Sequence, residues 1–166
     1  MAITYEPIAT TTLGTAAATL TLSTIPGSYT DLVLVASVKA STSGQGLTMQ
    51  FNGDGGAGSL YSTTGLRGNG TAASSFRQSN TNNVLLSNFA EPPTGSPNVC
   101  IAQFSNYSNT TTYKTVLVRA NSAGFGVDAL VGLWRNTNAI TSIKIDISGG
   151  NMSVGSTFTL YGIASA

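Results

Sequence analysis

The sequence of 166 residues contains no histidine and only one cysteine, Cys100. Without histidine the chain cannot build a Ser-His-Asp or Cys-His catalytic arrangement, and it lacks the ligand set of a usual zinc site. A lone cysteine cannot form an intrachain disulfide, and the apolar neighbours of Cys100 predict a small buried side chain. These absences exclude several common classes of enzyme and metalloprotein.

Charge is scarce as well, at 8% of residues with a net charge of +1. An ordinary soluble domain carries roughly 25% charged residues, so hydroxyls, amides, glycine and apolar atoms must cover most of this surface. Lys and Glu are depleted where proteins bind one another, because docking would desolvate their charges. We therefore expect copies of this chain or a partner to cover much of the surface.

Long hydrophobic runs and basic stripes are also missing. The longest purely apolar run spans residues 32–36, far below the ~18 residues needed to cross a membrane. The first residues show no signal-peptide pattern, which predicts synthesis in a cytoplasm. The seven basic residues are scattered and balanced by six acidic ones, unlike a nucleic-acid-binding stripe. We expect neither a membrane nor a nucleic acid as partner.

Paired carboxylates are the remaining catalytic possibility, as in glycosidases. The acidic residues mostly follow turns or alternate out of strands, where carboxylates are usually structural or solvated. They are Glu6, Asp31, Asp54, Glu91, Asp128 and Asp146. The glycine-rich segment 52–56 departs from a calcium-binding loop, since Thr63 stands at the twelfth position, and it favours a hairpin loop. We expect no enzymatic activity, no metal site and no cofactor.

What the sequence does contain is a periodicity of two, the pattern of half-buried strands. Residues 19–23 and 143–148 alternate most clearly between apolar and polar side chains. Further strands are expected at 31–40, 47–51, 83–89, 98–105, 113–121, 127–134 and 156–163, with weaker candidates at 59–63 and 72–78. Glycine, asparagine and proline clusters separate them, as in turns.

Strands at this spacing, with no helical segment between them, predict an all-β fold. We expect a single antiparallel β-sandwich, jelly-roll-like, with about nine or ten strands. Residues 15–166 would form the sandwich, and residues 1–14 an N-terminal extended arm or edge strand. Ile3, Tyr5 and Ile8 would then contact a neighbouring subunit through strand addition or an apolar groove.

Four aromatic residues leave two interpretations open. Tyr61, Tyr107, Tyr113 and Trp134 would pack in the core or a subunit interface, as large aromatic rings usually do. Alternatively, the loops around them would form a recognition surface for glycans. We favour the first interpretation.

Five segments resemble small structural proteins of tailed bacteriophages, particularly phages of cyanobacterial and other aquatic hosts. They are residues 5–14, 23–35, 49–54 with 60–62, 66–70 and 155–163. The resemblance spans nearly the whole chain and consists of turn and strand patterns. Members of this group are capsid decoration proteins or tail-fibre-like domains.

The resemblance implies a virion protein made in the host cytoplasm and located on the capsid exterior. It would be a decoration, or cement, protein that binds the major capsid protein and bridges neighbouring capsomers. It would also form a homo-oligomer, expected as a trimer, with Ile3, Tyr5 and Ile8 as subunit or capsid contacts. The alternative is a tail-fibre or receptor-binding module for host glycans, although the chain lacks a heptad or β-helical shaft.

Overall fold

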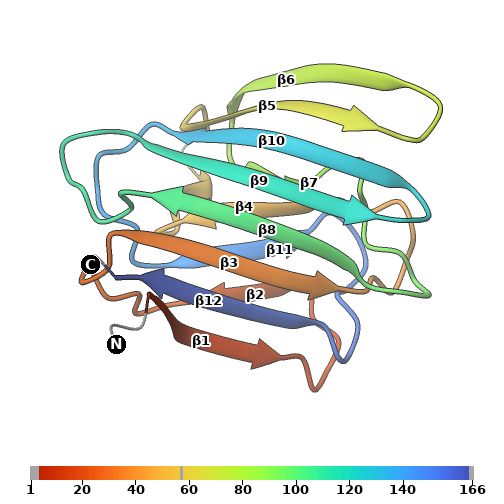
Figure 1. Ribbon diagram of the computed structural model, residues 1–166, viewed down its shortest axis with the longest axis horizontal. Coiled ribbons are helices and arrows are strands. Elements are labelled where there is room, and N and C mark those ends of the chain that lie inside the picture. The colour runs from red at the N-terminus through yellow and green to blue at the C-terminus, as the bar shows by residue number, and fades with distance from the viewer. Residues whose placement is uncertain (1–3, 57, 165–166) are drawn as a thin grey trace.

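The computed structural model describes residues 4–56 and 58–164, which form twelve strands and one short 3-10 turn. All strand pairs are antiparallel (Figure 1). The strands are β1 (Tyr5–Thr12), β2 (Thr19–Leu22), β3 (Asp31–Val38), β4 (Leu47–Phe51), β5 (Tyr61–Gly68), β6 (Ala73–Thr81), β7 (Val84–Ser87), β8 (Asn98–Ser105), β9 (Lys114–Ser122), β10 (Gly126–Trp134), β11 (Ile143–Ile147) and β12 (Thr157–Ile163). The 3-10 turn, η1, spans Asp54–Gly56.

The strands form two sheets that pack against each other. The larger sheet has eight strands in the order β1-β12-β3-β8-β9-β10-β5-β6, and the smaller has four in the order β2-β11-β4-β7. Pairing is nested along the chain: β1 with β12, β2 with β11, β3 with β8, β4 with β7 and β5 with β6. Such a folded long hairpin is jelly-roll-like, with the β9–β10 hairpin added to the larger sheet. The predicted antiparallel sandwich is confirmed.

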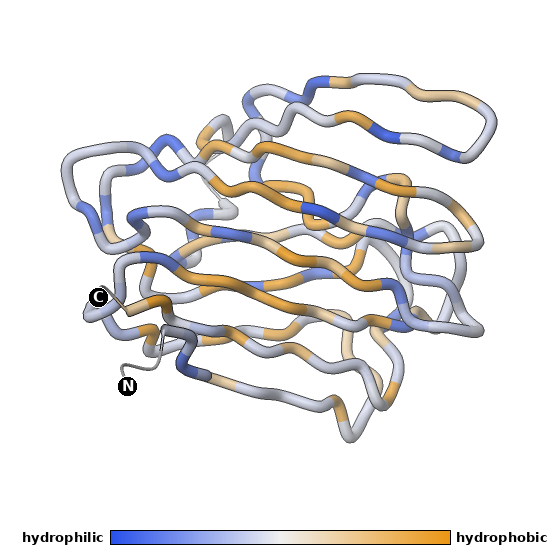
Figure 2. Tube along the Cα trace, viewed as in Figure 1, coloured by the Kyte–Doolittle hydropathy of each residue, from blue (hydrophilic) through white to orange (hydrophobic). Residues whose placement is uncertain are grey.

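One hydrophobic core fills the space between the sheets. Alternate residues of β9 and β10 point into it, as do Leu34 of β3 and Ile145 of β11, all of them buried. Figure 2 shows hydrophobic segments concentrated along the central strands, while the connecting loops are mostly polar. The period-two alternation therefore produces the sandwich, because each strand presents apolar side chains to the opposing sheet.

The count of nine or ten strands is wrong, because the described residues contain twelve. The strands without a clear sequence signal are β1, β5 and β6, at or near the two edges of the larger sheet. Seven of the nine residues of β6 are exposed, so burial imposes little hydrophobic alternation on its sequence. Apart from Phe76, which packs against the core, β6 is held by backbone pairing with β5, and such pairing leaves no hydropathy pattern.

The N-terminal segment was expected as an arm or an edge strand, and the structure shows an edge strand over residues 5–12. Tyr5–Thr12 pairs with β12 along its length, with a register shift between Pro7 and Ala9. Ile8 packs partly buried against the core, whereas Tyr5 is 55% exposed and lies edge-on to Tyr161. Ile3 lies outside the described residues.

Candidate interaction surface

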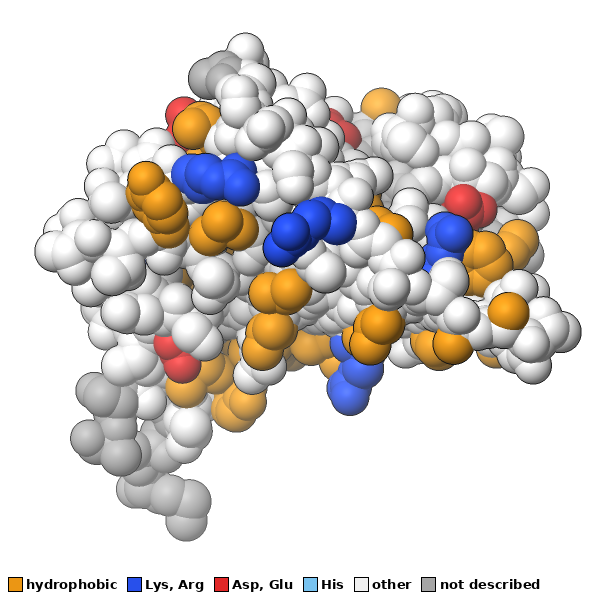
Figure 3. Space-filling model, turned by 90° about the horizontal axis from the view of Figure 1, so that it is seen from above, with side chains coloured by type: hydrophobic (Ala, Val, Ile, Leu, Met, Phe, Trp, Pro, Cys, Tyr) orange, Lys and Arg blue, Asp and Glu red, His pale blue; other side chains and the backbone are white. Residues whose placement is uncertain are grey.

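The outward-facing side of the larger sheet carries an exposed apolar patch over β5, β8, β9 and β10. Its members project away from the core in alternation with buried residues. We call this patch the outer apolar face; it consists of Leu66, Ile101, Leu117, Val127, Ala129 and Val131. Leu66 is 64% exposed and Leu117 58%. Figure 3 views the molecule from the β6 edge. Hydrophobic side chains project along its lower border, which is the side that faces the viewer in Figure 1.

The strand register brings these side chains together. Ala129 of β10 lies opposite Leu66 of β5, and Val131 lies opposite Leu117 of β9. Residues opposite each other on one sheet face are about 4.5–5.5 Å apart at Cβ, so the patch is continuous across strands. Three neighbouring strands thus present one apolar surface to solvent.

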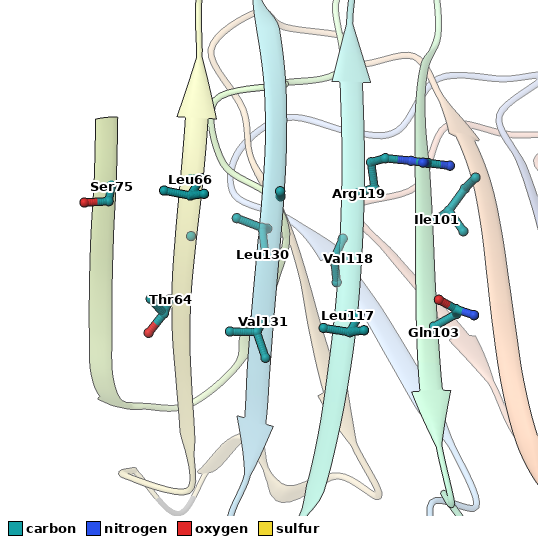
Figure 4. Close-up of a pocket in the computed structure, with 12 residues that line it drawn as sticks. Thr64, Leu66, Ser75, Ile101, Gln103, Leu117, Val118, Arg119, Leu130 and Val131 are labelled. Carbon is teal, nitrogen blue, oxygen red and sulfur yellow. The ribbon is translucent and has the colours of Figure 1, made fainter. Parts of the chain in front are cut away.

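A shallow groove runs over this face, with a volume of about 530 Å³. Leu117 and Val131 lie near its middle, with Leu66 and Thr64 of β5 on one side and Gln103 of β8 on the other (Figure 4). A second hollow of about 490 Å³ shares Leu66 and Ala129 with it and extends toward Val127. The shape suits an extended or flat protein surface better than a small molecule, which usually occupies an enclosed cleft.

One arginine stands within the outer apolar face. Arg119 projects from β9, and its cross-strand neighbours are Ile101 and Ala129. Within residues 4–56 and 58–164, the one ion pair joins Lys144 to Asp146 (2.9 Å) in the smaller sheet. Arg119 is therefore available to a carboxylate or carbonyl oxygen of a docking partner, surrounded by apolar contact area.

Sequence reasoning missed this surface, although β10 contains its signal. The segment 129–134 is apolar at both odd and even positions, a pattern typical of strands covered on both faces. Leu130 points into the core and Val131 points outward. The continuous apolar run thus indicates a second face that a partner would cover.

Tyr61, Tyr107 and Trp134 are all 0% exposed, so none of these three rings forms an exposed platform for a glycan, whereas Tyr113 is 57% exposed. Tyr61 stacks on Trp134 with ring centroids 6.4 Å apart, and Phe51 packs edge-on against Trp134 at 5.5 Å. The indole Nε1–H of Trp134 donates to Asp54 Oδ2 (3.2 Å). These rings fill the core, as the favoured interpretation predicted.

The hydroxyls of the two tyrosines have internal partners. The Phe51 N–H donates to Tyr61 Oη (2.9 Å), and Tyr107 Oη donates to the carbonyl of Pro26. Burial raises the pKa of Tyr61 to about 12. Both hydroxyls therefore stabilise the fold rather than face a ligand.

Several carboxylates bind neighbouring backbone and side-chain groups. Asp128, 1% exposed, accepts the backbone N–H groups of three successive residues, 88–90, on Oδ2 at 2.8–2.9 Å. Asp54 also accepts Asn136 Nδ2 (2.8 Å) beside the Trp134 indole, and Asp31 accepts the N–H of Asn106 (2.7 Å). These three carboxylates hold loops against the sandwich.

Cys100 is fully buried on the inner face of β8, as expected. Burial raises the pKa of its thiol to about 12. The thiol is therefore protonated near neutral pH and hidden from solvent, which makes it a packing group.

No protein-family model matches the chain, and no curated protein is recognisably similar to it. Across the part of the chain that the structure describes, there is no helix with the length and hydropathy to span a membrane.

Proposed function

We propose that this protein is a non-enzymatic structural component that docks on a larger protein assembly through its outer apolar face. The observation that carries the proposal is the exposure of Leu66, Leu117 and Val131 close together on one face of the larger sheet. Apolar side chains in such a group stabilise a complex when a partner removes them from water, by roughly 25 cal/mol per Å² of buried area.

The scarcity of charge supports the same function. With 8% charged residues, much of the surface can be covered without desolvating ammonium or carboxylate groups. Arg119 would fix the orientation of the complex, because a partner oxygen must lie opposite its guanidinium to accept a hydrogen bond from it.

In the form that the resemblance to tailed-phage structural proteins implies, the assembly is a capsid. The protein would then be a decoration protein on the capsid exterior that binds the major capsid protein and bridges neighbouring capsomers. Its mechanism is adhesion, since each copy adds buried interface across a seam between subunits. The alternative, a glycan-binding tail module, would keep only Tyr113 of the four candidate rings on its surface, because the other three are buried.

Quantitative mass spectrometry of purified particles of the encoding phage tests the location. Decoration predicts a copy number of the same order as that of the major capsid protein. A content of a few per cent of that amount would place the protein in the tail, and its absence from particles would contradict a virion role.

A matched pair of substitutions tests the surface. Leu117→Asp places a charge in the outer apolar face, whereas Val154→Asp changes an equally exposed apolar residue, at 56% against 58%, outside it. We expect Leu117→Asp to abolish binding to particles that lack the protein and Val154→Asp to leave binding intact. Equal binding by both variants would contradict docking through this face.

A further inference from the structure

The edge strand β6 (Ala73–Thr81) presents an unpaired row of backbone groups along one side of the larger sheet. It pairs with β5 on its inner side and is the last strand of that sheet. None of the hydrogen bonds among the described residues gives its outward backbone N–H and C=O groups a partner. At about 3.4 Å per residue, the seven regularly paired residues 73–79 offer roughly 24 Å of pairing edge.

Proteins usually protect such edges with proline, bulges, lysine or short length. At the opposite edge of the same sheet, β1 contains Pro7, a register shift beside it and Glu6. The two edge strands of the smaller sheet, β2 and β7, have four residues each. Three of the four edges are therefore protected.

The β6 edge is less protected, because its register shift lies only at its C-terminal end, at Asn80 (φ 57°). It contains no proline, and its pairing with β5 is regular from Ala73 to Ser79. Its one charged residue, Arg77, turns back over β5, where Nε donates to Thr64 Oγ1 (3.3 Å). The guanidinium therefore leaves the outer side of the strand open.

The position of β6 makes this edge accessible. The smaller sheet ends at β7, which packs across β5, β9 and β10, and the β5–β6 hairpin lies at one extreme of the molecule (Figure 1). A second strand can therefore approach from the side without meeting another part of the sandwich.

We infer that β6 pairs antiparallel with β6 of a second copy of this chain, so that two larger sheets join into one continuous sheet about a two-fold axis. Pairing of β6 with β1 of another copy would be head-to-tail, and Pro7 and the adjacent bulge disfavour it. Pairing of β6 with β6 of a second copy ends at two copies, because the dimer then has no unpaired β6 edge left.

The residues of β6 favour one register. An axis at Arg77 would set this arginine against its own copy, and like charges directly opposite are destabilising. An axis at Phe76 sets Arg77 opposite Ser75 of the second copy and brings the two Phe76 rings together. Phe76 is partly buried, and the Arg67 guanidinium lies 5.8 Å from its ring centroid, so the ring is already held in place.

The pairing is independent of docking through the outer apolar face. Two paired nine-residue strands bury less than the roughly 1,200–2,000 Å² of a standard stable interface, so the dimer should exchange with monomer. A trimer, which the family resemblance implies, is incompatible with this two-fold contact as the main association.

Sedimentation velocity over about a hundredfold range of concentration tests the pairing by mass action. We expect a monomer–dimer equilibrium for the native chain. Ser75→Lys with Ser79→Lys should weaken the dimer at least ~10-fold, because lysines protect an edge and the one introduced at position 75 would face Arg77 of the second copy. The matched control, Thr10→Lys with Thr12→Lys, adds the same charge to exposed positions of β1 and should leave the dimer unchanged.

Single-cysteine variants give a second readout that needs no disruptive substitution. The native thiol of Cys100 is buried, so oxidation reports the introduced cysteine. An equimolar mixture of Ser75→Cys and Arg77→Cys chains, whose introduced thiols lie directly opposite each other in the proposed register, should form a disulfide-linked dimer faster than Ser79→Cys alone, and Thr12→Cys should remain monomeric. A monomer at every concentration, a trimer, or faster linkage through Thr12→Cys would overturn the pairing.

Discussion

The two faces of the larger sheet are both apolar, yet they differ in composition and surroundings. The inner face carries the large rings of Tyr61 and Trp134, packed against Phe51 of the smaller sheet. The outer face carries aliphatic side chains such as Leu117 and Val131, which remain exposed. The inner face thus stabilises the fold, whereas the outer face retains apolar area that only a second molecule can bury.

The largest expected effect is the loss of stability when a large ring of the inner face is removed. Trp134→Ala would leave a cavity beside Tyr61 and Phe51 and remove the indole bond to Asp54. We expect a loss of about 3–5 kcal/mol in the free energy of unfolding, the range for large aromatic residues replaced by alanine in cores. Urea denaturation measures it, and a loss below about 1 kcal/mol would contradict the packing described for this ring.

A buried carboxylate at the end of the inner face gives the next effect. Asp128→Asn removes the negative charge that accepts three backbone N–H groups of residues 88–90. Hydrogen bonds to a charged acceptor each contribute about 1.5–3 kcal/mol, and we expect a total loss of about 2–3 kcal/mol. Hydrogen exchange should accelerate in residues 88–90 and remain slow in β3. Unchanged exchange at residues 88–90 would mean that Asp128 does not hold this loop.

A substitution on the outer face should weaken binding while leaving the free energy of unfolding nearly unchanged. Leu117→Ser removes a side chain that is 58% exposed, so we expect the free energy of unfolding to change by no more than about 0.5 kcal/mol. Binding to the partner assembly should fall markedly. A destabilisation comparable to that of Trp134→Ala would show that the outer face belongs to the folded core.

The smallest effect concerns pH. Desolvation, followed by the nearby charge of Asp128, raises the pKa of Glu91 above its ordinary value of 4.5. Between 4.5 and the folded pKa the native state binds more protons than the unfolded state, so this group lowers stability as pH rises through that window. Glu91→Gln should flatten the decline and slightly stabilise the protein at neutral pH. Urea titrations at a series of pH values measure it; an unchanged slope would contradict the raised pKa.

The fold class could be predicted from the sequence because alternating burial of strand residues produces a period-two hydropathy pattern. Ile143, Ile145 and Ile147 alternate in β11 and all point into the core, and hydropathy records such positions directly. The edge strands left a weaker trace, since β6 is held to β5 by backbone bonds and only Phe76 of its apolar side chains packs against the core. Strand count therefore failed at the edges of the sheet.

The candidate surface was not predictable in the same way. Hydropathy gives Leu117 and Val116 the same weight, and only the placement of β9 in its sheet shows that Val116 is buried while Leu117 is exposed. The aromatic residues illustrate the reverse case. Trp134 lies at a strand end, where a loop platform and a core position look alike until the packing of Phe51 is known.

Covalent footprinting of side chains in free and particle-bound protein tests docking through the outer apolar face most directly. We predict that labelling of Leu66, Leu117 and Val131 falls sharply on binding, while labelling of the equally exposed Val154 stays unchanged. Undiminished labelling of the three outer-face residues, with Val154 protected instead, would contradict the proposed docking surface.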